Sequence, residues 1–160
     1  MKLGIDISQI VYEGTGVARF TSGLVKAILD YDCANNWTFF FSSLRRNLDQ
    51  DIENKILIKG HKLIKWNLPP TVLSFFWNDL HDFSKLLTSN FKHLTTQDWF
   101  ISSDWTEPPL NVKKATVVHD LVYLRYPETV DDKIIALQKR LLILLYKQIQ
   151  LERLFLEQVL

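Results

Sequence analysis

The sequence has little of several things that mark specialised classes of protein. Its 160 residues include one cysteine, Cys33, so no internal disulfide can form and the composition fits a reducing compartment such as the cytoplasm. Lys and Arg number 19 and Asp and Glu number 18, a net charge of +1, which argues against a nucleic-acid partner bound through bulk electrostatics. The longest apolar runs are about six residues, whereas a spanning helix needs roughly 20. Asp6 also interrupts any apolar region of a signal peptide.

The composition that is present indicates a folded domain. Hydrophobic residues make up 47% of the chain, aromatic residues 12% and charged residues 23%, which excludes a disordered chain. The length suits one domain, since domains commonly span roughly 100–200 residues. We expect a cytoplasmic protein that touches a membrane at most at its periphery.

Short apolar runs alternate with segments of helical periodicity. Strands are predicted at residues 3–7, 37–41, 55–59, 98–102 and 115–118. Helices are predicted at residues 17–29, 71–80 and 83–91, and a long one begins at Asp131 or Asp132 as N-cap. This order predicts a doubly wound α/β domain, with a mostly parallel sheet and helices on both faces.

A loop with two glycines joins the first predicted strand to the first helix. Gly14 and Gly16 allow close approach of a ligand to the backbone, and a helix N-terminus attracts anions. Arg19 in the first turn opposes the helix dipole, which makes it a candidate anion ligand. The loop is neither a dinucleotide fingerprint nor a P-loop, because the third glycine and the Gly-Lys-Ser/Thr sequence are missing. The alternative interpretation is that the glycines simply permit a turn.

A histidine follows the last predicted strand. Ligands of open parallel sheets bind beyond the carboxyl ends of the strands, which is where His119 and Asp120 fall. An imidazole there can donate a hydrogen bond to a sugar or phosphate oxygen. The alternative is a histidine satisfied by a backbone carbonyl. The spacing of His and Cys predicts no metal site, and no Ser-His-Asp nucleophile arrangement can be argued.

Two other features have simple structural interpretations. The aromatic segment 66–77 can contact a lipid-linked acceptor or a membrane, but we favour burial against the sheet. The basic pair Arg45 and Arg46, like Lys113 and Lys114, is expected to be solvated surface, with a membrane-facing role as the alternative.

Three segments resemble the N-terminal domain of retaining glycosyltransferases of the GT-B fold, of the group 1 or family 4 type. Residues 2–6 with 14–21 (GTGVARFT) look like the family's opening strand and its Gly-x-Gly-x-x-Arg-Tyr/Phe-Thr loop. Residues 98–104 form the second segment. Residues 116–128 look like its strand, His-Asp-Leu and Tyr/Phe-Pro-Glu segment, which is the most specific of the three. The match covers residues 1–145, and residues 146–160 form an atypical helical tail.

The resemblance implies transfer of a hexose from a nucleotide diphosphate sugar, the donor substrate, to a sugar or lipid-linked acceptor. It places Gly14, Gly16 and Arg19 near the diphosphate and His119 at the transferred sugar, and it implies no metal. Asp98, Asp104 and Asp120 are candidate partners of acceptor hydroxyl groups.

The sequence departs from the family in two places. Ile101 stands where many relatives have a histidine, which can alter acceptor contacts. The family continues into a C-terminal domain that carries the donor-holding basic and Glu-x7-Glu-type residues, and this domain is absent from the sequence. We therefore expect the chain to be inactive alone, as a truncated or frameshifted product. One alternative is a non-catalytic binding half that pairs with a separate C-terminal chain; another is an unrelated doubly wound ligand-binding domain.

Overall fold

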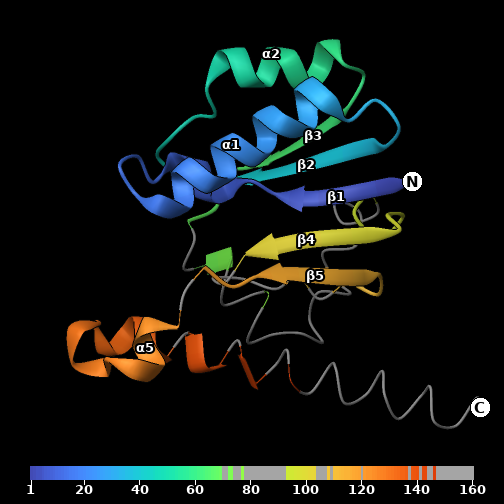
Figure 1. Ribbon diagram of the computed structural model, residues 1–160. Helices are drawn as coiled ribbons and strands as arrows, with labels where there is room; N and C mark the ends of the chain where they lie inside the picture. The colour runs from blue at the N-terminus through green and yellow to red at the C-terminus, as the bar shows by residue number, and fades with distance from the viewer. Residues whose placement is uncertain are drawn as a thin grey trace, which may run out of the picture.

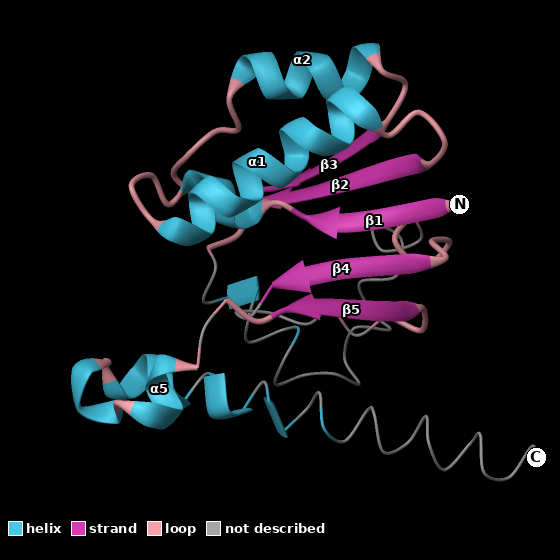
Figure 2. Cartoon of the chain, viewed as in Figure 1, coloured by secondary structure: helices cyan, strands magenta, loops and turns pink. Residues whose placement is uncertain are grey.

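The fold is built on a five-stranded parallel sheet, seen here in a computed structural model (Figures 1 and 2). The structure describes residues 1–69, 72–73, 77, 93–103, 108, 110–119, 121–136, 138–140, 142–143 and 146. The strands are β1 (Lys2–Asp6), β2 (Asn36–Ser42), β3 (Lys62–Trp66), β4 (Trp99–Ser103) and β5 (Lys113–Val117). Their order is β3-β2-β1-β4-β5, with every neighbouring pair parallel. The predicted α/β class is confirmed.

The burial of strand β2 shows that the sheet is covered on both faces. Consecutive side chains of a strand point to opposite faces, and yet Phe39, Phe40 and Phe41 are all buried. Phe39 and Phe41 belong to the core cluster that includes residues of α1 and α2, whereas Phe40 packs in a second cluster with Trp77. Continuous apolar burial of this kind is typical of parallel sheets with a layer on each face.

The first helix, α1 (Gly16–Tyr31), covers the face that carries Phe39 and Phe41, and it lies beside the second helix, α2 (Gln50–Ile58), in Figure 1. The predicted helix at residues 17–29 is confirmed within two residues at each end. Its inward-facing aliphatic side chains Val25, Ile28 and Leu29 are buried against the sheet.

The prediction of a strand at residues 55–59 is wrong, because this segment is the end of α2. Asp49 caps the helix through its Oδ1, which accepts from the backbone N–H groups of Asp51 (2.9 Å) and Ile52 (3.2 Å). Gly60, at φ +76°, ends it in the left-handed conformation that glycine allows. The apolar run between two lysines that suggested a strand belongs instead to a helix in which Ile56 is buried, Ile52 is partly buried against the core, and Leu57 and Ile58 are exposed. The third strand of the chain is β3, which begins at Lys62, after this helix.

The aromatic segment packs in the core where the structure describes it. Trp77 is 1% exposed and its ring lies 5.0 Å from that of Phe40, while the Trp66 ring meets Phe40 edge-on at 5.2 Å. Leu73 is buried in the same cluster. The interpretation as buried core is confirmed for these residues. The predicted helix at 83–91, most of the helix predicted at 71–80 and nearly all of the tail at 146–160 lie outside the described residues.

After β5 the chain forms short helical elements at the carboxyl end of the sheet. These are α5 (Val122–Arg125) and the 3-10 turn η4 (Pro127–Thr129), which no sequence pattern predicted. The predicted long helix follows, and its cap is Asp131, whose Oδ1 accepts from the Lys133 N–H at 2.8 Å. Among the described residues, no helix is both long and apolar enough to cross a membrane.

The strand order locates the switch point of the sheet. From β1 the chain runs to β2 on one side, and its later return places β4 on the other side of β1. In open parallel sheets a ligand binds beyond the carboxyl ends of the strands at such a point. Both candidate segments, residues 14–19 and His119, follow strands at this carboxyl edge.

Candidate functional site

The glycine loop is a capped entry into α1. Gly14 adopts φ +83°, which glycine allows without strain, and Gly16 is the first residue of the helix. Thr15 is the N-cap: its Oγ1 accepts from the Ala18 N–H at 3.1 Å and donates to the carbonyl of Tyr12 at 2.7 Å. The cap therefore takes one of the amide groups that an anion at the helix N-terminus can use, and it ties the start of the helix to the loop at Tyr12.

A buried polar network lies directly before this loop. Asp6 is 4% exposed, and its Oδ1 accepts from the Ser8 N–H (2.8 Å) and Ser8 Oγ (2.5 Å). Ser8 Oγ accepts from the Ser42 N–H at 2.9 Å, and Ser42 Oγ donates to the Leu68 carbonyl at 3.1 Å. The buried Gln9 Oε1 has no hydrogen-bond partner among the described residues. The network joins the carboxyl ends of β1 and β2 to the segment after β3.

His119 meets the glycine-loop helix. It follows β5 after Val118, and its ring packs edge-on against Phe20 with 5.2 Å between ring centroids and an interplanar angle of 81°. Phe20 is 47% exposed and lies in α1 next to Arg19. Two segments that are far apart in the sequence thus come together at the carboxyl edge, on either side of the switch point.

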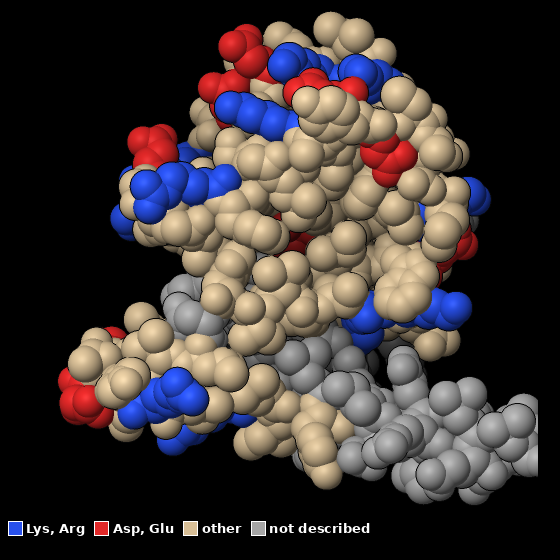
Figure 3. Space-filling model, in the orientation of Figure 1, with Lys and Arg blue, Asp and Glu red and all other residues tan. Residues whose placement is uncertain are grey.

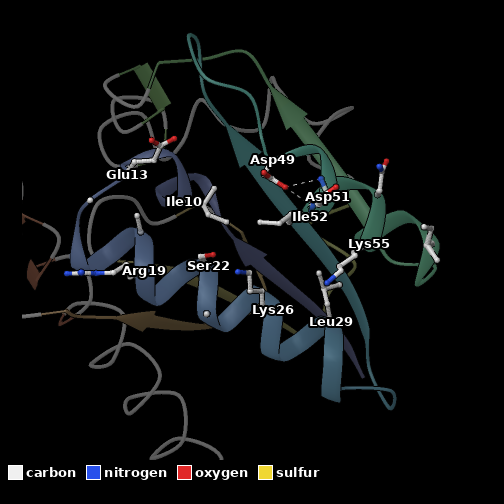
Figure 4. Close-up of a pocket in the computed structure, with 15 residues that line it drawn as sticks. Ile10, Glu13, Arg19, Ser22, Lys26, Leu29, Asp49, Asp51, Ile52 and Lys55 are labelled. Carbon is white, nitrogen blue, oxygen red and sulfur yellow. Dashed lines mark hydrogen bonds between the residues drawn. The ribbon is translucent and has the colours of Figure 1, made fainter.

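A groove of about 910 Å³ runs between α1 and α2, beginning at the glycine loop (Figure 4). In Figure 4 the aliphatic side chains of Ile10 and Ile52 point toward one another across it. Its charged lining residues are the cations Arg19, Lys26 and Lys55 and the carboxylates Glu13, Asp49 and Asp51. Figure 3 likewise shows both charge signs interspersed over the helical layer. The groove as a whole does not select for an anion, so an anion would depend on Arg19 at the loop end.

Arg46 acts on the loop from the neighbouring connection. Its guanidinium donates a hydrogen bond to the Val11 carbonyl, and its backbone N–H donates to Ser43 Oγ at 3.1 Å. Burial and the charge of Asp6 raise the pKa of Tyr12, against a smaller opposing effect of the Arg46 charge. The Tyr12 phenol therefore stays protonated, and able to donate a hydrogen bond, well above neutral pH. Arg46 is exposed, as expected, and its guanidinium is also tied to the segment that precedes Gly14.

Of the three candidate acceptor residues, Asp98 is the one that the structure describes, and it does not join this cluster. Asp98 lies at the amino end of β4, where its Oδ2 accepts from the Lys2 N–H at 2.7 Å and its own N–H donates to the Lys2 carbonyl at 2.7 Å. It is at the edge of the sheet opposite the glycine loop. Asp104 and Asp120 lie outside the described residues.

Sequence reasoning missed the polar residues around the loop. Gln9 and Arg46 belong to no motif, and Asp6 is expected only as part of the opening strand. The parallel pairing of β1 with β2 brings the three to the same edge of the sheet. A carboxylate ending a buried strand was the available signal for Asp6. Within the part of the chain that the structure describes, no group of three or more His, Cys, Asp and Glu side chains is placed to hold a metal ion.

Comparison with protein-family models, with curated proteins and with solved structures finds no match for this chain. The structure itself shows a parallel, Rossmann-like fold.

Proposed function

We propose that this chain is the acceptor-side domain of a retaining glycosyltransferase of the GT-B, family 4 type. The parent reaction transfers a hexose from a nucleotide diphosphate sugar to a sugar or lipid-linked acceptor. The observation that carries the proposal is the contact between His119 and the glycine-loop helix through Phe20. The two most specific motif segments meet at the edge of the sheet where ligands of such folds bind.

The residues have distinct roles in this proposal. Arg19 and the glycine-loop amides bind the donor diphosphate, and charge-assisted hydrogen bonds from Arg to phosphate are the strong kind. Gly14 and Gly16 keep side chains away from the diphosphate. The His119 imidazole donates a hydrogen bond to a hydroxyl group of the transferred sugar and so orients its anomeric carbon. The packing of the His119 ring on Phe20 supports that role by fixing its direction.

The domain is proposed to be inactive by itself. In the resembled family the donor is held mainly by a C-terminal domain, whereas the motifs found in these 160 residues are the loop and the histidine. We expect no turnover of any nucleotide sugar by the purified 160-residue chain. Turnover is measured as release of the nucleotide diphosphate. Measurable transfer or hydrolysis would overturn this part of the proposal.

Weak donor binding is the direct test of the site. Calorimetric titration of the chain with nucleotide diphosphate sugars is expected to show millimolar binding that Arg19→Ala weakens about tenfold, the equivalent of about 1.4 kcal/mol for a lost charge-assisted bond. His119→Ala is expected to weaken the binding of the nucleotide sugar but not the binding of the free nucleotide diphosphate. Arg45→Ala is the matched control, because Arg45 is exposed and does not line the groove. Binding that is unchanged in both site variants would favour an unrelated ligand-binding domain.

A second candidate function is a non-catalytic half that pairs with a separate C-terminal chain. It is favoured by large apolar side chains that are 41–56% exposed between β5 and η4: Val118, Leu121, Val122, Leu124 and Tyr126. A run of this kind at the carboxyl edge suits a protein contact. Sedimentation of the purified chain tests it. A strictly monomeric chain that co-purifies with no partner would count against this candidate.

A further inference from the structure

A second, smaller cavity adjoins the glycine loop. It measures about 480 Å³, within the ~300–1,000 Å³ range of small-molecule sites. Its lining residues come from the loop after β1 and from the connection between β2 and α2: Ile10, Val11, Glu13, Arg46, Asn47 and Asp49. Three of these, Ile10, Glu13 and Asp49, also line the groove between α1 and α2, so the two depressions share a wall.

The lining has the chemistry of a site for hydroxyl groups. The carboxylates of Glu13 and Asp49 accept hydrogen bonds, the Arg46 guanidinium donates, and the Asn47 amide does both. Ile10 adds apolar surface for the carbon-bound faces of a ring. Two carboxylates against one guanidinium disfavour an anionic ligand, in contrast to the Arg19 end of the groove.

Two of these side chains are held in place by the protein itself. The Arg46 guanidinium is anchored on the Val11 carbonyl, and Asp49 is oriented because its Oδ1 caps α2 through the N–H groups of Asp51 and Ile52. Groups fixed before binding lose less entropy when a ligand arrives, so a weak polar ligand can be recognised.

We propose that this cavity, the Glu13–Arg46 pocket, binds a glycosyl unit of an uncharged carbohydrate through its hydroxyl groups. The identification of that unit as the sugar acceptor rests on the proposed function. The binding of a neutral carbohydrate rests on the pocket alone. The shared wall places such an acceptor beside the donor site at the Arg19 end of the groove.

The test uses the full chain and two probe series, methyl glycosides of common hexoses and inorganic pyrophosphate. Backbone amide shifts report where each binds. We expect at least one glycoside to shift the amides of Ile10, Glu13 and Asn47. Two variants test the lining. Glu13→Gln keeps the size of the side chain but removes its charge, and Asn47→Ala removes the amide. Each is expected to lower the affinity for that glycoside about tenfold, which corresponds to about 1.4 kcal/mol. Arg45→Ala is the matched control and is expected to change nothing.

The outcomes separate the two proposals. The pocket is overturned when no glycoside shifts these amides, when the shifts lie elsewhere, or when pyrophosphate alone produces them. A glycoside can bind in the pocket while pyrophosphate does not shift the amides of Gly16 and Arg19. That result would support the pocket as a carbohydrate site and contradict the proposed transferase function. Melting temperatures of the variants close to that of the unmodified chain ensure that lost binding is not lost folding.

Discussion

The two ends of the parallel sheet use their polar residues differently. At the amino end, the Asp32 carboxylate accepts hydrogen bonds from the Ala34 N–H, from the Asn35 N–H and side chain and from Trp37 Nε1, and its pKa falls to about 2, chiefly through the Asn35 and Trp37 side chains. The amino group of Met1 donates to Asn35 Oδ1 at 3.0 Å, and Asp98 accepts from the Lys2 N–H. The hydrogen bonds of these groups stabilise turns and the first residues of strands.

At the carboxyl end, polar groups surround depressions. Glu13 and Arg19 line cavities, Gln9 has a buried oxygen without a hydrogen-bond partner among the described residues, and His119 packs edge-on against the first helix. The comparison teaches that a charged residue near a strand is a site candidate only when it follows the strand. Asp98 precedes β4 and therefore belongs to the structural end.

The largest expected contrast is between Asp6 and Asp98. Asp6→Ala leaves the buried N–H and hydroxyl of Ser8 without their acceptor, so we expect the free energy of unfolding to fall by about 2–4 kcal/mol. Asp98→Ala removes an exposed bond to the Lys2 N–H and is expected to cost about 1 kcal/mol. Urea denaturation measures both. Equal losses would contradict the larger contribution expected from the buried carboxylate of Asp6.

Two glycines, one in the loop before α1 and one inside that helix, are expected to respond with opposite signs. Gly14→Ala forces a side chain into the left-handed region, which costs about 1–2 kcal/mol of stability. Gly23 lies inside α1, where an added Cβ would meet no described atom within 4 Å. Gly23→Ala is therefore expected to stabilise the chain by about 0.5–1 kcal/mol. Thermal unfolding checks the pair. A Gly14→Ala chain that is no less stable than the unmodified chain would show that the loop conformation is misassigned, and a destabilised Gly23→Ala chain would contradict the open space at Gly23.

The smallest expected effect is a pH dependence at the amino end. The pKa of Asp32 is lowered from 3.8 to about 2 in the folded chain, so its contribution is present above pH 4 and is lost as the pH falls toward 2. Asp32→Asn is expected to flatten the fall of stability in that window. Asp30→Asn, which removes an exposed carboxyl of α1, is the control. An unchanged slope in Asp32→Asn would mean that its hydrogen bonds do not distinguish the folded state.

Much of the fold follows from local patterns, but the site does so only in part. Apolar runs such as residues 37–41 predict strands because burial on both faces leaves no alternation. The segment 55–59 misleads because a short apolar run between two lysines fits either element, and the deciding signals, the Asp49 cap and Gly60, lie outside it. The glycine loop and His119 are found from motifs. Arg46 is not, because its bond to Val11 depends on the pairing of distant strands.

The most direct test of the central claim, that the carboxyl edge is the ligand-binding end, is a map of backbone amide shifts in the unmodified chain on titration with a nucleotide diphosphate sugar. The account predicts shifts at Gly14, Gly16, Arg19 and His119, with Asp32, Asn35 and Asp98 unmoved. Shifts concentrated at the amino-end residues, or no shifts at all at millimolar ligand, would contradict it.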